Sequence, residues 1–193
     1  MKEQLGKLAS IQTGYSLRTR IEPKADGSLQ AIQMKDLTDD SRVDCSQLVR
    51  IELEKVGEHH FARLGDLVLR SRGQNPKSAL IDVDPGSAIV ISPLLRIRIK
   101  DVRLTSEYLN WFINQKDAQA WLASRMMGSH GGMITKGTVE ELEIEIPPRE
   151  KQNLVVELAA LSEREKSLMK ELSNKKSDYV NAIILKYLKG ERK

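Results

Sequence analysis

The sequence of 193 residues is poor in the residue types that build disulfide-stapled or metal-bound sites. It holds one cysteine, Cys45, which excludes an intrachain disulfide and a cysteine-rich zinc site. Of its three histidines, His59 and His60 are adjacent and would point apart, which is poor spacing for a shared metal, and His130 is isolated. We therefore expect no bound metal and a reduced, structural thiol.

Long hydrophobic runs are also missing. No window approaches the roughly 18 unbroken apolar residues that a membrane-spanning helix needs. The first residues, MKEQLGKLAS, lack the apolar segment of a secretory signal peptide. Together these absences predict a cytoplasmic protein.

The common catalytic motifs are absent as well. There is no GxSxG elbow, no P-loop and no GxGxxG fingerprint, and the string GSHGG lacks the strand-before, helix-after context of a phosphate-binding loop. Asp39, Asp40, Asp44 and Glu52 could be imagined as metal ligands of a nuclease, but acids in a polar loop usually face water. We expect a chain that is not an enzyme and needs no cofactor of its own.

Positive charge is unevenly distributed along the chain. The net charge is +4. Residues 151–193 hold ten Lys/Arg and six Asp/Glu, whereas residues 1–150 hold 21 of each. The N-terminal part is therefore formally neutral, and only local clusters of cations could attract an anionic partner there.

Residues 1–147 have the mixed patterning of an α+β domain. Short segments rich in Ile, Val and Leu, bounded by Gly, Pro, Asp or Asn, predict strands within residues 31–37, 65–73, 87–100 and 139–146. LRIRIK and ELEIEI alternate strictly, as half-buried strands do. One helix is expected over residues 106–127, capped by Thr105 or Ser106 and followed by Gly128.

From Pro148 onward the pattern changes to that of one long helix over residues 148–193. The string IPP favours a sharp strand-to-helix boundary, and no Gly or Pro occurs between Pro148 and Gly190. Roughly 40 residues would make a helix of about 60 Å. An a/d seam for dimerisation, interrupted by Glu165 and Lys175, is formed by Leu154, Leu158, Leu161, Leu168, Leu172 and Tyr179. So long a seam calls for a partner helix; the alternative is a helix that folds back as an ordinary surface element.

Four segments and this helix occur in an order that resembles a known family. The segments are GYSLRTRIEPKADGSLQAIQMKDL (Gly14–Leu37), GDLVLRSRG (Gly65–Gly73), SEYLNWFIN (Ser106–Asn114) and GSHGGMITKGTVEELEIEIPPREKQ (Gly128–Gln152). Over essentially the whole chain, their order and spacing resemble the specificity (S) subunit of type I restriction–modification systems. Each string alone is loose, but the ordered set is specific.

The resemblance implies a function in DNA recognition. A typical S subunit carries two target-recognition domains, each reading one half of a split DNA site, and two antiparallel helical spacers that separate them and bind methyltransferase (M) subunits. This chain resembles a half-length S subunit with one domain and one spacer. It would form a homodimer through its helix, or pair with another S-like chain, in a complex that contains M subunits and possibly the restriction (R) subunit. A rod near 60 Å suits half-sites separated by one or two turns of about 35 Å.

Three stretches, residues 14–20, 63–77 and 125–136, gather cations with few acids. Arginine can pair with guanine, and Gln or Asn with adenine, while Lys, Arg and Ser can contact phosphates. The candidate DNA-binding residues are Arg18, Arg20, Arg70, Arg72, Gln74, Asn75, Lys77, Ser129, His130 and Lys136.

Each of these assignments has a plainer alternative. Arg70 and Arg72 could lie on the solvated face of a strand, Gly128 could be a helix C-cap, and Lys136 could be a surface lysine. For the whole chain, the rival function is a coiled-coil dimerisation or scaffold module whose domain grips another protein. The neutral charge of residues 1–150 supports that rival.

Overall fold

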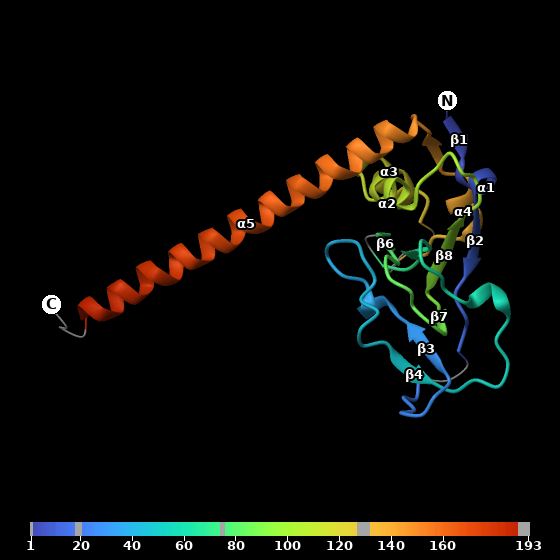
Figure 1. Cartoon of the computed structure of the whole chain (residues 1–193), viewed down its shortest axis with the longest axis horizontal. Coiled ribbons are helices and arrows are strands. Elements are labelled where there is room, and N and C mark those ends of the chain that lie inside the picture. Colours follow the sequence, from blue (N-terminus) through green and yellow to red (C-terminus); the bar gives the residue numbers. More distant parts are fainter. Residues whose placement is uncertain (1, 18–20, 74–75, 127–131, 189–193) are drawn as a thin grey trace. The chain divides into compact units, whose positions relative to one another are not determined.

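The computed structural model describes residues 2–17, 21–73, 76–126 and 132–188. The chain divides into two compact units, Met1–Gln152 and Asn153–Lys193. Among the described residues, the strands and the short helices lie in the first unit, and residues 153–188 of the second unit belong to one helix (Figure 1). The α+β class expected from the sequence is confirmed.

A four-stranded antiparallel sheet forms the centre of the first unit. Its strand order is β2 (Ala9–Thr13), β8 (Leu94–Ile99), β5 (Leu67–Arg70) and β6 (Ser78–Leu80). All three apolar residues of β5, Leu67, Val68 and Leu69, are fully buried, so both faces of the sheet are covered. The alternation of LRIRIK predicted a half-buried strand, and this was wrong at Arg96, which is buried in β8.

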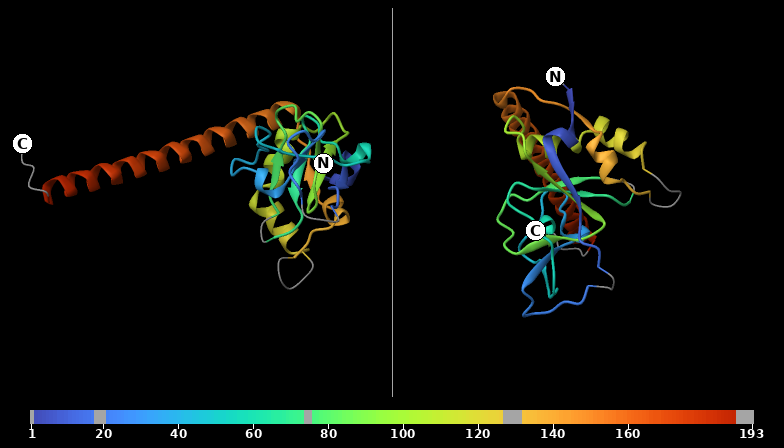
Figure 2. Two further views of the ribbon diagram at one scale, coloured as in Figure 1. Left: turned by 90° about the horizontal axis from the view of Figure 1, so that it is seen from below. Right: turned by 90° about the vertical axis from the view of Figure 1, so that its right-hand side faces the viewer.

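A second sheet contributes to two apolar clusters, one around Ala31, Ile51 and Ile89 and another that it shares with the four-stranded sheet. It has the order β4 (Val49–Ile51), β3 (Leu29–Ile32) and β7 (Ala88–Val90), in which β3 and β7 run parallel. Two short 3₁₀ turns, η1 (Met34–Asp36) and η2 (Glu58–His60), follow β3 and β4. The strand expected within residues 31–37 therefore gives way to a turn after Ile32. This sheet lies at one end of the unit (Figure 1; Figure 2, right).

The first and last strands of the unit pair with each other at its other end. They are β1 (Lys2–Gln4) and β9 (Glu143–Glu145), and Leu5 at the start of helix α1 (Leu5–Leu8) donates its N–H to the carbonyl of Leu142. The strand expected from residue 139 was wrong at its start, because helix α4 (Lys136–Glu140), capped by the Thr135 hydroxyl, occupies that segment.

The helix expected over residues 106–127 is two helices, α2 (Ser106–Ile113) and α3 (Lys116–Ala123). The predicted cap is confirmed: the Thr105 hydroxyl accepts a hydrogen bond of 3.1 Å from the Tyr108 N–H. The single helix was wrong because Gln115 adopts an extended backbone conformation. A break at this point lets the side chain of Asn114 hydrogen-bond with Ser78 of the edge strand β6.

Helix α5 (Arg149–Leu188) begins directly after the two prolines, as IPP predicted. Its first turn belongs to the first unit because Gln152 is fully buried. The Gln152 amide accepts a hydrogen bond from the Thr105 N–H and donates to the carbonyls of Arg103 and Pro147. Across the described residues, none of the helices combines the length and hydropathy that a membrane span requires.

The second unit exposes the predicted seam. Leu154, Leu158, Leu161, Leu168, Leu172 and Tyr179 have between 54% and 68% of their surface exposed. Most helical stability in proteins comes from packing of an apolar face. The stripe is therefore a surface that favours association.

Candidate nucleic-acid interface

One edge of the four-stranded sheet gathers the ends of several loops. Because β2, β8, β5 and β6 are antiparallel, the C-terminal ends of β2 and β5 lie at the same edge as the N-terminal ends of β8 and β6. The described parts of the segments that leave or enter here are residues 14–17, 71–73, 76–77 and 91–93. We call this the loop edge.

Ser71 is the hub of the loop edge. Its N–H and its hydroxyl both donate to the Pro93 carbonyl, at 3.0 and 2.6 Å. Its own carbonyl accepts a hydrogen bond of 2.7 Å from the Ile134 N–H, and the next residue, Arg72, forms an isolated β-bridge with Met133. Backbone hydrogen bonds thus connect the second basic stretch, residues 63–77, to the third, residues 125–136.

The first basic stretch starts from the same edge. Ser92, beside Pro93, donates its N–H to the Tyr15 carbonyl at 3.0 Å, and Tyr15 donates to the Val90 carbonyl at 2.7 Å. At Gly14 a Cβ atom would come within 2.6 Å of the Ile91 backbone, so only glycine permits this close approach. Beside it lies an open pocket of ≈ 300 Å³, lined by Ser16, Leu17, Ile21, Ile91 and Ser92.

Two cations of the loop edge, Arg72 and Lys77, have exposed side chains. Arg125, just after α3, stacks on the Trp121 ring with 3.9 Å between the guanidinium carbon and the ring centroid. Lys136 is less free, because its Nζ lies 3.6 Å from a carboxylate oxygen of Glu140. Exposed cations with a stacked Arg–Trp pair are suited to phosphate contact and to base-edge readout.

Arg70 is held differently from Arg72. Its Nη2 donates to the carbonyls of Met34 and Leu37, both at 3.2 Å, and its side chain is half-buried. This geometry favours a structural role that ties η1 to β5. The sequence predicted a phosphate contact for Arg70, with a place on the solvated face of a strand as the alternative. Neither expectation included these hydrogen bonds.

Six of the candidate DNA-binding residues lie outside the described residues. They are Arg18, Arg20, Gln74, Asn75, Ser129 and His130. What the structure describes are the segments that flank them, and all three flanking regions meet at the loop edge.

The stretch 63–77 does not act as one cluster. Arg63 precedes β5 and lies at the opposite edge of the sheet, 3.9 Å from Glu58, whereas Arg72 and Lys77 follow β5 at the loop edge. The acid of this stretch, Asp66, is buried and does not offset the charge of the loop edge.

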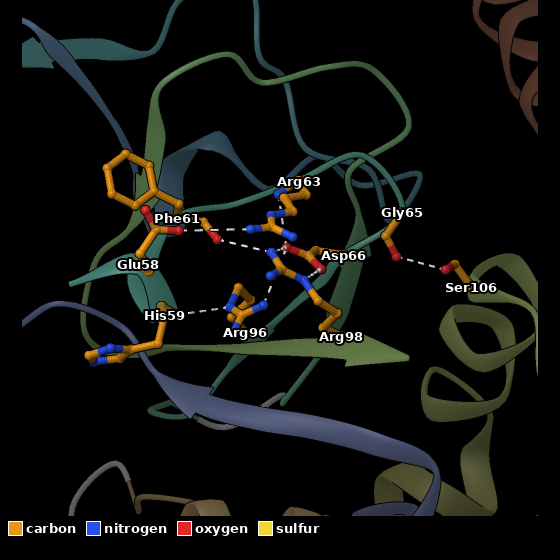
Figure 3. A network of polar contacts seen from close by, with 9 residues as sticks. All are labelled: Glu58, His59, Phe61, Arg63, Gly65, Asp66, Arg96, Arg98 and Ser106. Atoms are coloured by element: carbon orange, nitrogen blue, oxygen red, sulfur yellow. Dashed lines mark hydrogen bonds and ion pairs between the residues drawn. The ribbon is translucent and has the colours of Figure 1, made fainter. Parts of the chain in front are cut away.

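Asp66 instead anchors a buried polar network that sequence reasoning missed (Figure 3). Arg98 donates from Nε and Nη2 to the two Asp66 oxygens at 2.7 and 2.6 Å, and the Arg63 N–H donates at 2.8 Å. Arg96 is within 3.6 Å of the same carboxylate and donates from Nε to the His59 carbonyl. Burial lowers the pKa of Arg96, and the negative charge of Asp66 counteracts this effect.

The acids between residues 22 and 58 outnumber the cations nine to five, so the second sheet and its loops form an acidic lobe. Several of these acids serve local structure. Asp44 accepts hydrogen bonds from the Ser46 hydroxyl and N–H, which lower its pKa, and Glu52 likewise accepts from Ser28. In the described part of the chain, no group of three or more His, Cys, Asp or Glu side chains is arranged to hold a metal ion.

Solved structures share this fold. A chain from a study of complex assembly and conformational transition of the type I R-M system matches with a TM-score of 0.71 and 17% identity, covering 95% of this chain and 43% of that chain. The HsdS subunit from Thermoanaerobacter tengcongensis gives a TM-score of 0.64 at 17% identity, covering 89% of this chain and 39% of its own. The S subunit from M. genitalium gives 0.55 at 15% identity, covering 88% and 41%. The fold is that of type I specificity subunits, and this chain spans about two-fifths of the length of these relatives.

The family follows from a more direct comparison. The model of the type I restriction modification DNA specificity domain matches residues 1–175. The chain therefore belongs to this family, as its ordered motifs indicated. A search among curated proteins finds no match.

Proposed function

We propose that this chain recognises a specific DNA sequence as the specificity subunit of a type I restriction–modification complex, with its one domain reading one half of a bipartite target. The observation that carries the proposal is the loop edge, where three basic stretches distant in sequence converge through Ser71 and the Ser92–Pro93 turn. Membership in a DNA specificity domain family supports the same reading.

At the loop edge, different side chains make different kinds of contact with duplex DNA. Exposed Lys77 supplies charge to the phosphates, and Arg72 supplies a fork of donors that suits guanine or a phosphate. The acidic lobe of residues 22–58 repels the duplex elsewhere and so restricts its orientation. The other candidate contacts are Arg18, Arg20, Gln74, Asn75, Ser129, His130 and Lys136.

Helix α5 places a second reading head at a defined distance. Its exposed stripe packs against the same stripe of a second copy, which gives a homodimer with two recognition domains. At 1.5 Å per residue the rod is about 60 Å long, which sets the scale of the gap between half-sites. Pairing with a different S-like chain would serve the same purpose.

The end of α5 has a wider apolar surface than one partner helix would cover. At about 100° per residue, its last ten residues spread apolar side chains over more than half of the circumference. These are Tyr179, Val180, Ile183, Ile184, Leu185, Tyr187 and Leu188, all at least 47% exposed. This surface suits methyltransferase subunits, with restriction subunits joining through them.

The chain itself performs no catalytic step in this proposal. Methyl transfer and its adenosylmethionine belong to the M subunits, and cleavage belongs to the R subunit. The complex acts in the cytoplasm, where it meets DNA. The rival, a coiled-coil scaffold that binds no DNA, has only the neutral charge of residues 1–150 in its favour.

Fluorescence anisotropy with a labelled random-sequence duplex tests the proposal, using the full chain alone and with its methyltransferase. We expect binding at low salt that weakens steeply as salt rises, because phosphate contacts release counterions. Selection from a randomised duplex library should then enrich a divided sequence. Absence of binding in both forms would favour the scaffold.

A further inference from the structure

The segment Pro76–Ser78 at the loop edge is gripped by side-chain amides from α2 and α3. Asn114, which caps the end of α2, accepts a hydrogen bond of 3.1 Å from the Ser78 N–H and donates one of 2.9 Å to the Ser78 carbonyl. Because β6 is the last strand of its sheet, the amide takes the two backbone bonds that a further strand would make.

A second amide holds the other end of the segment. Gln119 on α3 donates from Nε2 to the Pro76 carbonyl at 3.0 Å and to the Ile113 carbonyl at 2.7 Å. Between them, the Lys77 carbonyl accepts a hydrogen bond of 3.0 Å from the Arg70 N–H. All three consecutive carbonyls, from Pro76 to Ser78, are thus bonded to fixed elements.

In this arrangement, the charge that attracts DNA and the groups that fix the backbone belong to different residues. The Lys77 side chain is exposed and free to reach a phosphate, while its backbone is fixed on both sides. Asn114 and Gln119 are uncharged and half-buried, so they add nothing to the electrostatic attraction of DNA. What they supply is a fixed starting geometry for the chain that carries the contacts, which favours discrimination between sequences.

We propose that Asn114 and Gln119 are positioning residues for DNA readout, which set the sequence specificity of the loop edge without contributing to its charge-driven affinity. The inference rests on the proposed function and adds to it a structural role for the break between α2 and α3. Because of this break, the end of α2 and the start of α3 each place one side-chain amide against the segment Pro76–Ser78.

The test compares Gln119→Met with wild type in the full chain. Methionine keeps a side chain of similar length and removes the donor to Pro76. Gln115→Met is the matched control, because the Gln115 amide donates to the Trp111 carbonyl of α2 and not to the segment Pro76–Ser78. Gln119→Asn, which withdraws the amide by one methylene, is a second variant in case the first folds poorly. Circular dichroism establishes folding of each.

Two duplexes are needed: the one that wild type selects from a randomised library, and a scrambled duplex of equal composition. The specificity ratio is the affinity for the first divided by that for the second. For Gln119→Met we expect this ratio to fall about three- to tenfold, the scale of one missing hydrogen bond. The slope of log affinity against log salt should stay unchanged for both duplexes, because every cation is retained.

The outcomes separate the two proposals. A wild-type ratio of one would overturn the proposed function and this inference with it. Discrimination by wild type that Gln119→Met retains in full, or that Gln115→Met loses to the same extent, would overturn the inference alone. A purely structural role is recognised by equal loss of affinity for both duplexes, which also contradicts it.

Discussion

The backbone N–H of Ile134 lies 2.7 Å from the carbonyl oxygen of Ser71, although 62 residues separate them in the chain. This bond continues β5 past its last strand residue and brings residues 132–136 against residues 71–73. Two loops that would each be weakly basic alone therefore share one surface, and phosphate contacts from both can act on the same stretch of DNA.

The exposed cations of the loop edge should dominate nonspecific DNA binding. Arg72→Ala with Lys77→Ala is expected to reduce affinity for all duplexes and to lower the salt slope by about 0.9 for each phosphate that is no longer neutralised. The control is Lys55→Ala, an exposed lysine of the acidic lobe, which should leave both quantities unchanged. Anisotropy titrations at several salt concentrations measure them. An unaltered slope in the double variant would show that the DNA binds elsewhere.

The stripe of α5 should control association. Leu161→Glu or Leu168→Glu places a charge in a seam that needs apolar cover, so the assembly should dissociate to monomers in light scattering. Ser167→Glu introduces the same charge at the neighbouring position, which lies outside the stripe, and it should not change the mass. A wild-type chain that is monomeric would instead indicate pairing with a second S-like chain.

Features encoded locally could be predicted from the sequence. The boundary at IPP, the Thr105 cap and the long helix depend on residues within one or two turns, and the structure places all three as expected. Family membership followed from motif order rather than from any single string.

Features that depend on distant partners could not be predicted. Arg96 reads as the polar face of an alternating strand, and only Asp66 and the His59 carbonyl explain its burial. In the sequence, Asn114 looks like one more helical residue. Its hydrogen bond to the Ser78 carbonyl is visible only in the structure. The meeting of residues 71–73 with residues 132–136 leaves no trace in composition or periodicity. The GD before β5, with Asp66 as its acid, is the one local signal that the network offered.

The buried network around Asp66 should be essential to the stability of the first unit. Asp66→Asn would leave Arg96 and Arg98 without their counter-charge and should lower the free energy of unfolding by about 3–5 kcal/mol. Urea denaturation measures this loss. Glu58→Gln removes an exposed acid 3.9 Å from Arg63 and serves as control, with little expected change. Equal effects of the two substitutions would contradict the assignment.

Stability should also depend on His60 at mildly acidic pH. Burial and the nearby His59 and Arg96 charges lower the pKa of His60 below its usual 6.5. As the pH falls through 6.5, His60 takes up a proton in the unfolded chain but not yet in the folded chain. The free energy of unfolding therefore decreases until the pH has passed the lower pKa of the folded state. Urea unfolding at about pH 7.5 and about pH 5.5 should show a smaller difference for His60→Gln than for wild type. The same difference in both would rule out this group.

The most direct test of the loop edge is photocrosslinking of duplex DNA from two positions at opposite edges of the same sheet. Met133 is exposed next to Arg72, and Leu64 is exposed beside Arg63 at the far edge. With p-benzoylphenylalanine replacing one or the other, we expect crosslinks from position 133 and none from position 64. Crosslinks from position 64 alone would place the DNA at the opposite edge of the sheet, away from every contact proposed, and would contradict the account.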